Sequence, residues 1–363
     1  MSSLRPGGAL GDLSDRLAEA VTLIDAPDIV LAVTHRGSRT VITGGTALAP
    51  PTPRHALRYE LGSLSKTFTV LLLAQLARAG VLSLDDRLAD HLPGRPLPHA
   101  ASRRITLRHL ATHTSGLPRI PPDLVTGALL HPYRNGYARY DSERLLDTFA
   151  RTRLRHAPGT RWRYSNFGLA LLGPAMEGAA GADFATLLTD RVLRPLGLGG
   201  TTLGAGTTGT DAIGHRTNGV TPVPGTDMGG FRAAGAVHAP PGDLLTYLEA
   251  HLDPGGTPLA GALRDVQVPL LRRGWQHRHT HTLTWYQHPA PRGPLLFHVG
   301  ATFGQQALLG FHPPSGTGLV AIATRRGRTC HMVDTAYELL YELAGDPGGG
   351  SGRGGDPVVA EGP

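Results

Sequence analysis

The chain has 363 residues, of which 40% are hydrophobic and 17% are charged, as in an ordinary soluble globular protein. Its net charge of +7 comes from 35 basic and 28 acidic residues, but the arginines are scattered and no basic run alternates with aromatic residues. Cys330 is the only cysteine, which excludes an intramolecular disulfide, and no segment approaches the roughly 20 apolar residues that span a bilayer. We therefore expect no nucleic-acid partner and no membrane partner.

The N-terminal residues and the composition give an expectation about location. Residues 1–16 carry Arg5, Asp12, Asp15 and Arg16 and lack an apolar stretch, so they do not form a signal peptide. This predicts a cytoplasmic protein. The 49 Gly and 30 Pro, with abundant Ala and Arg, are typical of a GC-rich genome, which is compatible with a role in secondary metabolism.

The first 80 residues contain three predicted elements in succession. Apolar residues in 11–24 recur at the spacing of an amphipathic helix. Residues 28–45 contain two strand-like runs around a turn at Gly37, which predicts a hairpin. Residues 58–79 predict a short strand that runs into a helix, with Gly80 as its stop signal.

The chain changes character near residue 280. Residues 85–270 mix helical patterns with long loops rich in Gly and Pro. Four strand-like runs and a closing helix follow, at 281–288, 293–300, 304–312, 317–325 and 333–344. Because both chain ends supply strands and helices, we predict an α+β fold, with an antiparallel sheet built from both ends, flanked by helices, and an inserted, mostly helical lobe.

These elements predict one domain over residues 1–345. Its sheet lobe takes about 1–62 and 283–345, and its helical lobe takes about 63–282. Residues 346–363 are rich in Gly and are expected to form a flexible tail with no core to join.

Lys66 is the only lysine among the 35 basic residues. Arginine can replace lysine as a surface cation, but it cannot lose its proton at working pH. A lone lysine therefore points to proton-transfer chemistry, with chance survival as the alternative.

Ser63 precedes Lys66 by three residues and stands at the start of the predicted helix. Residues three apart lie on one helical face, so the lysine can reach the serine hydroxyl. The free N–H groups and the positive end of the helix dipole also favour a developing oxyanion there. The alternative is a capping serine followed by a solvated lysine. The apolar helix argues against it, because an unpaired lysine would be costly in such surroundings.

Tyr164, Ser165 and Asn166 form a second candidate motif, Tyr-x-Asn. A tyrosine beside a buried lysine can act as a phenolate or can relay a proton to a leaving group. Asn166 can hold a substrate amide and also bond to the lysine. The alternative is a turn tyrosine with a capping asparagine before a helix.

The segment His298-Val299-Gly300 is a weaker signal. With 18 His and 49 Gly in the chain, His-x-Gly triplets are expected by chance. This one closes the apolar run 293–300, where Gly300 would let a substrate backbone approach closely.

Three further histidines, His277, His279 and His281, alternate along a possible strand. Two or three of them could share a face and bind a metal. No acidic residue or cysteine lies nearby, so a solvent-facing polar strand is the favoured interpretation. We expect no metal and no cofactor.

Three segments, in order and separation, resemble the signature motifs of the serine β-lactamase-related family of class C β-lactamases, DD-peptidases and family VIII-type esterases. They are YELGSLSKTF at 59–68, RYSNFG at 163–168 and FHVGATFG at 297–304. Residues 105–118 and 228–248 look like supporting loops of that family. The resemblance covers about residues 15–345 and implies a β-lactamase/transpeptidase-like fold.

The resemblance implies roles for seven residues. The implied catalytic residues are Ser63, Lys66 and Tyr164, and the implied substrate-binding residues are Asn166, His298, Gly300 and Ala301. Ser63 would be acylated, Lys66 and Tyr164 would move protons, and Asn166 would orient the substrate. The backbone N–H groups of Ser63 and Ala301 would form the oxyanion hole.

One departure from the family pattern concerns substrate choice. Many relatives have lysine where this chain has His298, and histidine is only partly charged near neutral pH. This weakens a cationic anchor for a substrate carboxylate, so uncharged esters or thioesters are expected to react better than β-lactams.

Together these observations predict a serine hydrolase that works through an acyl-Ser63 intermediate on an ester, thioester or amide of a small metabolite. One alternative is an acyltransferase that passes the acyl group to a small-molecule acceptor. The other is a catalytically silent binding module with the same fold. The complete set of Ser63, Lys66 and Tyr164 favours an enzyme, and the expected cytoplasmic location argues against a cell-wall peptidase.

Overall fold

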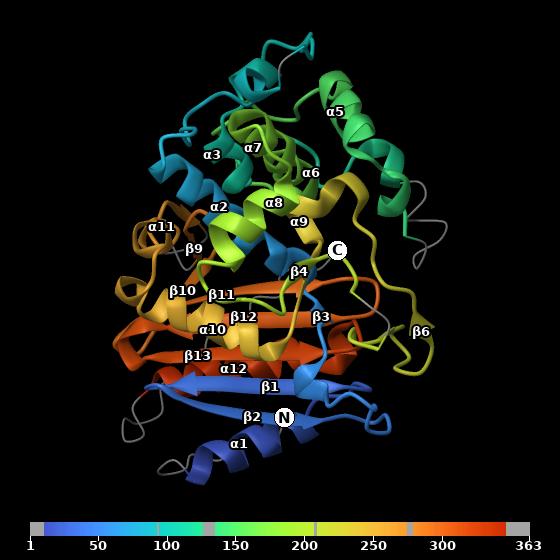
Figure 1. Cartoon of the computed structure of the whole chain (residues 1–363), viewed down its shortest axis with the longest axis vertical. Coiled ribbons are helices and arrows are strands. Elements are labelled where there is room, and N and C mark those ends of the chain that lie inside the picture. Colours follow the sequence, from blue (N-terminus) through green and yellow to red (C-terminus); the bar gives the residue numbers. More distant parts are fainter. Residues whose placement is uncertain (1–10, 93, 126–134, 207–208, 274–278, 346–363) are drawn as a thin grey trace.

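The computed structural model describes residues 11–92, 94–125, 135–206, 209–273 and 279–345, with the main sheet and its covering helices in one half and a mostly helical lobe in the other (Figure 1). The sheet is eight-stranded and antiparallel throughout. No helix within these ranges is long and apolar enough to cross a membrane. The predicted fold class is confirmed.

Strands from both chain ends make the main sheet, in the order β2-β1-β13-β12-β11-β10-β9-β8. The strands are β1 (Ile29–His35), β2 (Ser38–Gly44), β8 (Leu271–Arg273), β9 (His279–His281), β10 (Tyr286–Ala290), β11 (Gly293–Ala301), β12 (Gln306–His312) and β13 (Thr317–Ala323). β1 pairs with β13 along its whole length, which joins the two chain ends within one sheet.

The central strands are buried on both faces, which explains their nearly continuous apolar sequences. Successive residues of β1 point to opposite faces of the sheet. Ile29, Leu31 and Val33 pack into one hydrophobic core, and Val30 and Ala32 pack into the other. The sheet therefore separates two cores.

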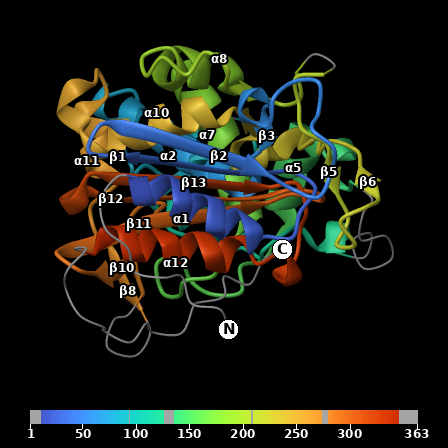
Figure 2. The ribbon, with the colours of Figure 1, turned by 90° about the horizontal axis from the view of Figure 1, so that it is seen from below.

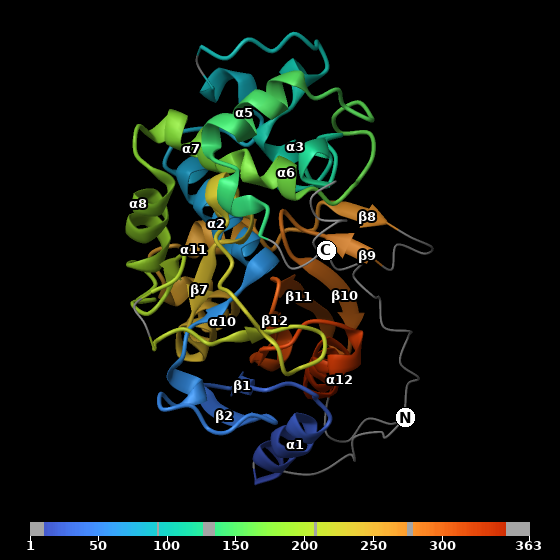
Figure 3. The ribbon, with the colours of Figure 1, turned by 90° about the vertical axis from the view of Figure 1, so that its right-hand side faces the viewer.

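Helices cover both faces of the sheet. α1 (Gly11–Thr22) and α12 (Met332–Ala344) lie side by side on one face (Figure 2). α10 (Pro241–Leu252) lies on the other, against β12 and β13 (Figure 3). The sequence predicts that the C-terminal part of the sheet lobe begins near residue 283. In the structure it begins earlier, because β8 and β9 are strands of the main sheet and α10 packs on that sheet. β8 and β9 are short and polar, so they lack the alternation of a half-buried strand.

The helical lobe and the connecting segments contain the remaining elements. The helices are α2 (Ser65–Arg78), α3 (Leu107–Ala111), α5 (Ser142–Arg151), α6 (Asn166–Ala170), α7 (Leu172–Ala180), α8 (Phe184–Leu188), α9 (Arg232–Gly235) and α11 (Ala260–Asp265). A small sheet has the order β3 (Tyr59–Glu60), β7 (Val237–Ala239), β4 (Thr202–Leu203), and β5 (Gly214–His215) pairs with β6 (Pro222–Val223).

α2 runs through the middle of the molecule (Figure 1). Its residues 65–74 are all buried, as expected of a helix that is apolar on every side. Ala79 caps its C-terminus, and Gly80 follows in the left-handed conformation that the sequence predicts for a stop signal. The N-terminus of α2 meets β11, so its first turn lies where the sheet joins the helical lobe.

Candidate active site

Ser63 lies in a 3₁₀ turn, Gly62–Leu64, that runs directly into α2, as predicted for a serine at a helix start. Gly62 has a φ of +51°, and a Cβ there would come within 2.3 Å of the Ala301 carbonyl oxygen. Only glycine fits both the left-handed backbone and this close approach. The turn therefore lies against the end of β11, with the Ala301 backbone beside Gly62, the residue before Ser63.

Gly300 packs against the same turn. A Cβ at this position would lie 1.9 Å from the Leu61 carbonyl oxygen and 2.8 Å from the Leu64 nitrogen. The close approach that the sequence assigns to a substrate backbone is thus made by the protein's own nucleophile turn. Gly300 and Gly62 together set the spacing between β11 and the start of α2.

Lys66 is 1% exposed, and its Nζ lies 2.9 Å from Ser63 Oγ and 2.8 Å from the Ala234 carbonyl oxygen. Burial lowers the pKa of Lys66 well below its usual value, and the charge of Arg119 adds to the shift. A neutral amine has a lone pair. Because the Ala234 carbonyl accepts one N–H, that lone pair is available to the Ser63 hydroxyl. Lys66 can therefore act as a general base toward Ser63.

Tyr164 also contacts Ser63. Its Oη donates to Ser63 Oγ at 2.6 Å, and its ring centre lies 5.2 Å from Lys66 Nζ. Burial raises the pKa of Tyr164 above its ordinary value and Tyr286 adds to the shift, whereas the hydrogen bond to Ser63 and the charge of Arg119 oppose it. A phenolate is therefore disfavoured. Of the two roles left open by the sequence, the geometry favours a protonated tyrosine that relays a proton.

His113 and Ser165 hold the loop that carries Tyr164. The Ser165 N–H donates to His113 Nδ1 at 3.2 Å, and the His113 carbonyl accepts the Arg163 N–H at 2.8 Å. Ser165 Oγ donates in turn to the Pro118 carbonyl at 2.6 Å. Burial lowers the pKa of His113 well below its usual value, so the ring is neutral and Nδ1 can accept. These bonds fix Tyr164 relative to the loop after α3.

Asn166 begins α6 and is 8% exposed. Its Oδ1 is buried and has no hydrogen-bond partner among the described residues. Lys66, the partner expected from the sequence, bonds instead to Ser63 and Ala234. Asn166 therefore keeps an acceptor for an N–H or O–H group of a substrate.

His298 lies on β11 and is 2% exposed. Burial is the largest cause that lowers the pKa of His298, to about 3. The partly charged histidine expected from the sequence is thus neutral at physiological pH, because its ring is removed from water. Nδ1 lies 2.9 Å from the Val299 carbonyl oxygen, which can only accept, so Nδ1 carries the proton and Nε2 is an acceptor.

The histidine run does not form the solvent-facing strand that was expected. His277 lies outside the described residues. His279 Nδ1 lies 3.3 Å from His288 Nε2, and His281 is buried with its ring centre 5.2 Å from that of Trp162. The described part of the chain contains no group of three or more His, Cys, Asp or Glu that could hold a metal ion.

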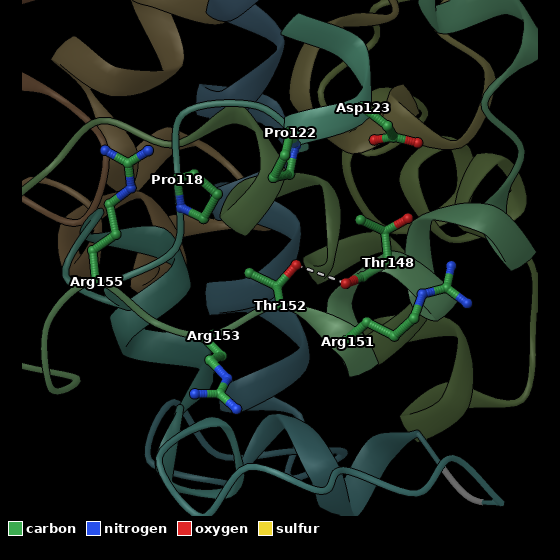
Figure 4. Close-up of a pocket in the computed structure, with 8 residues that line it drawn as sticks. All are labelled: Pro118, Pro122, Asp123, Thr148, Arg151, Thr152, Arg153 and Arg155. Carbon is green, nitrogen blue, oxygen red and sulfur yellow. Dashed lines mark hydrogen bonds between the residues drawn. The ribbon is translucent and has the colours of Figure 1, made fainter.

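Two hollows lie outside this group of residues. One, of about 380 Å³, is lined by Pro118, Pro122, Asp123, Thr148, Arg151, Thr152, Arg153 and Arg155 (Figure 4). Its three arginines point away from one another, so they do not converge on a single anion (Figure 4). The other, of about 490 Å³, is bordered by Glu60, whose two oxygens already accept hydrogen bonds from Thr226. Ser63 lines neither hollow.

Sequence reasoning missed two contributors to the site. Ala234, in α9, supplies the carbonyl that Lys66 contacts. Arg119 places its guanidinium carbon 5.6 Å from the centre of the Tyr164 ring. Ala234 lies within one of the two segments that resemble supporting loops, and Arg119 directly follows the other. The sequence thus points to both regions but singles out neither Ala234 nor Arg119.

The chain is similar to known proteins along most of its length. The profile of the Beta-lactamase family matches residues 15–343. Penicillin-binding protein 4 of Amycolatopsis lactamdurans is 29% identical over 94% of this chain and 86% of its own length, and a β-lactamase of Escherichia coli (strain K12) is 25% identical over 87% of this chain and 89% of its own. A class C β-lactamase from Rhodobacter sphaeroides, 26% identical, superposes with a TM-score of 0.75 and covers 92% of this chain and 99% of its own.

Proposed function

Because the chain belongs to the Beta-lactamase family, whose members act on amide and ester bonds, we propose that it is a serine hydrolase that forms an acyl-Ser63 intermediate. The substrate is an ester, thioester or amide of a small molecule. Lys66 and Tyr164 move the protons, and no cofactor takes part.

One observation carries this proposal: Ser63 Oγ lies 2.9 Å from Lys66 Nζ and 2.6 Å from Tyr164 Oη. A serine nucleophile needs a base for its own proton and an acid for the leaving group. Burial favours a neutral amine at Lys66 and a protonated phenol at Tyr164, so the base and the acid are each in the required state before reaction. A binding module would gain nothing from a buried lysine held in this state.

Acylation then proceeds with balanced proton transfers. Lys66 takes the Ser63 proton as Oγ bonds to the carbonyl carbon, and the developing oxyanion faces the N–H groups of Ser63 and Ala301. When the bond to the leaving group breaks, Tyr164 protonates that group and receives the proton held by Lys66. Water attacks the acyl-serine through the same groups in reverse, which releases the acid and restores Ser63.

The β11 side of the site favours substrates without a carboxylate beside the scissile bond. His298 is neutral there, and its neighbours Val299 and Ala301 have apolar side chains. A β-lactam carries a carboxylate next to its scissile amide, and this strand offers it no fixed cation. We infer that simple activated esters react faster than penicillins or cephalosporins.

Intact-protein mass spectrometry tests the acyl-enzyme directly. Incubation with p-nitrophenyl esters, a thioester or a penicillin is expected to add one acyl group per chain, which peptide mapping places on Ser63. The Ser63→Ala variant should remain unlabelled while keeping the wild-type melting temperature. An adduct of the same stoichiometry in Ser63→Ala would overturn the assignment.

Steady-state kinetics test the substrate class. We expect kcat/KM for a p-nitrophenyl ester to exceed that for a chromogenic cephalosporin. The ratio should not change between pH 5.5 and pH 8, because His298 stays neutral over that range. A ratio that shifts toward the cephalosporin as the pH falls would show that His298 takes up a proton and binds the carboxylate.

A further inference from the structure

Arg119 is held within the active site by its backbone. Its carbonyl accepts the Phe167 N–H at 3.1 Å, which ties the loop after α3 to α6. Its guanidinium lies over the ring of Tyr164, and its charge acts on both Lys66 and Tyr164. Arg119 therefore lies beside the catalytic residues rather than on the outer surface.

Arg119 has no anionic partner among the residues that the structure describes, and its Nη2 is buried without a hydrogen bond. Two other partly buried arginines have a carboxylate partner. Arg54 Nε lies 2.7 Å from Asp28 Oδ1, and Arg58 Nε lies 2.9 Å from Asp211 Oδ1. A guanidinium N–H that is removed from water costs free energy unless it finds an acceptor. The unpaired guanidinium of Arg119 is therefore suited to bind an anionic ligand.

Two neighbours of Arg119 make this a polar site of more than one group. Burial raises the pKa of Tyr137, whereas a hydrogen bond from the Asn166 side chain and the charge of Arg119 oppose that shift. Asn166 Oδ1 is buried and has no hydrogen-bond partner among the described residues, so it can accept an N–H or O–H group of a substrate. Asn166 is 92% buried (8% exposed), so this acceptor is not satisfied by bulk water.

We propose that Arg119 forms a subsite for a negatively charged group, such as a carboxylate, on the acyl part of the substrate. The proposal rests on the proposed acylation of Ser63. Arg119 lies over the Tyr164 ring, 5.6 Å from its centre, and its backbone carbonyl accepts the Phe167 N–H of α6. We assign its unpaired Nη2 to the part of the substrate that stays on Ser63.

The two sides of Ser63 then differ in charge preference. β11 presents a neutral histidine, and the side of α6 presents an unpaired guanidinium. A guanidinium binds a carboxylate through two parallel N–H donors, which is stronger and more directional than a neutral contact. The preferred substrate is therefore an ester or amide with an anionic acyl group and an uncharged leaving group.

A pair of matched esters tests this preference. The two esters are mono-p-nitrophenyl adipate and methyl p-nitrophenyl adipate. They differ only at the far end of the acyl group, which is a carboxylate in the first and an uncharged methyl ester in the second. We expect wild-type kcat/KM to favour the free acid about tenfold or more. Arg119→Met should abolish this preference, and Arg119→Lys should retain part of it. Arg153→Met, an exposed arginine of the same lobe, is the matched control and should keep the full preference.

The outcomes separate this proposal from a purely electrostatic role. If Arg119→Met lowers kcat/KM equally for both esters and shifts the pH profile, Arg119 acts only through Lys66 and Tyr164, and the subsite is wrong. The subsite is also wrong if the wild type prefers the methyl diester, or prefers charge only when it is placed in the leaving group.

A binding measurement keeps the subsite testable apart from turnover. In Ser63→Ala, calorimetry should give a lower Kd for monomethyl adipate than for dimethyl adipate, and the difference should vanish in Ser63→Ala/Arg119→Met. Equal affinities would overturn the subsite while leaving the acyl-enzyme untouched. Absence of any Ser63 adduct with both esters, with selective binding intact, would overturn the proposed hydrolysis alone.

Discussion

Burial of Lys66 is unfavourable for stability, but it gives the amine the neutral state that a general base needs. Lys66 is 1% exposed, and burying an ammonium group without a carboxylate is unfavourable, so the amine gives up its proton instead. Arginine could not do this, because its guanidinium stays charged at any pH of interest. A chain that uses arginine at every other basic position therefore still needs lysine here.

Replacing Lys66 by arginine should be nearly as damaging as replacing it by alanine. Loss of a general base typically lowers the rate by about 10²–10⁴-fold, and arginine supplies charge but no base. The measurement is kcat/KM for a p-nitrophenyl ester, with thermal unfolding as the check on folding. Arg78→Lys, an exposed exchange on the same helix, should leave the rate unchanged. If Lys66→Arg keeps most of the activity, Lys66 is only an electrostatic anchor and Tyr164 must move the protons alone.

At the residue scale, the sequence predicts what is local and misses what folding brings together. Ser63 and Lys66 could be found because three residues on a helix place them within reach. The neutrality of His298 could not, since it follows from burial between elements far apart in the chain. Arg119 could not be identified either, because its contact with Tyr164 joins two loops that lie some distance apart in sequence.

At the element scale, the site depends on how closely β11 approaches the start of α2. A Cβ on Gly300 would lie 1.9 Å from the Leu61 carbonyl oxygen, and a Cβ on Gly62 would lie 2.3 Å from that of Ala301. Both clashes involve backbone atoms, which cannot rotate away as a flexible side chain can. The strand and the turn therefore fit only when both positions are glycine.

Gly300→Ala should displace the nucleophile turn from β11. We expect it to reduce the free energy of unfolding by about 1–3 kcal/mol and to lower kcat on the order of a hundredfold, because the reacting groups are misplaced. Urea denaturation and ester hydrolysis measure the two effects. In the matched control, Gly242→Ala in α10, an added Cβ meets nothing within 4 Å, so this variant should gain about 0.5–1 kcal/mol. Wild-type kcat in Gly300→Ala would contradict the role given to this spacing.

The elements themselves were predictable to the extent that burial follows sequence pattern. The hairpin of β1 and β2, the last three strands and both terminal helices show clear apolar periodicity and are present. The prediction of a single strand over 281–288 is wrong, because residues 282–285 form a turn between β9 and β10. β8 and β9 are three residues each and largely polar, so no alternation marks them. The sequence predicts α10 as part of the helical lobe, whereas in the structure it packs on the main sheet. The apolar face of a helix does not indicate which layer of the fold the helix will cover.

At the scale of the whole molecule, the sheet and the helical lobe meet at Ser63. The sheet supplies β11, the lobe supplies Tyr164, and α2 carries Ser63 and Lys66 between them. Each part contributes groups that are neutral because they are buried. Folding and catalysis are thus linked, because a group that binds a proton in the unfolded chain but not in the folded chain lowers the free energy of unfolding.

His251 shows this linkage away from the active site. It lies in α10 against the sheet, 1% exposed, with ring centres 5.1 Å from Trp285 and 5.3 Å from Phe311. Its Nδ1 donates to the Tyr247 carbonyl at 2.9 Å, and its Nε2 is buried without a hydrogen-bond partner in the part of the chain that the structure describes. Burial lowers the pKa of His251 to about 4. The ring therefore stays neutral in the folded chain at pH values where it would be charged in water.

The sign of the effect on stability follows from that shift. Below pH 6.5 the unfolded chain binds a proton at His251 that the folded chain refuses until about pH 4, so the free energy of unfolding falls as the pH drops through this window and is constant above it. Between pH 7.5 and pH 5.0 this one group should lower the free energy of unfolding by about 2 kcal/mol.

His251→Phe removes the titrating group and keeps the packing. Its free energy of unfolding should therefore exceed that of the wild type by an amount that grows by about 2 kcal/mol between pH 7.5 and pH 5.0. His55→Gln, at a histidine that is exposed in the folded chain, should follow the wild-type curve. Urea denaturation at the two pH values decides the matter: if the curves of His251→Phe and wild type stay parallel, His251 takes up its proton in the folded chain as readily as in the unfolded one, and the acid sensitivity of this fold lies elsewhere.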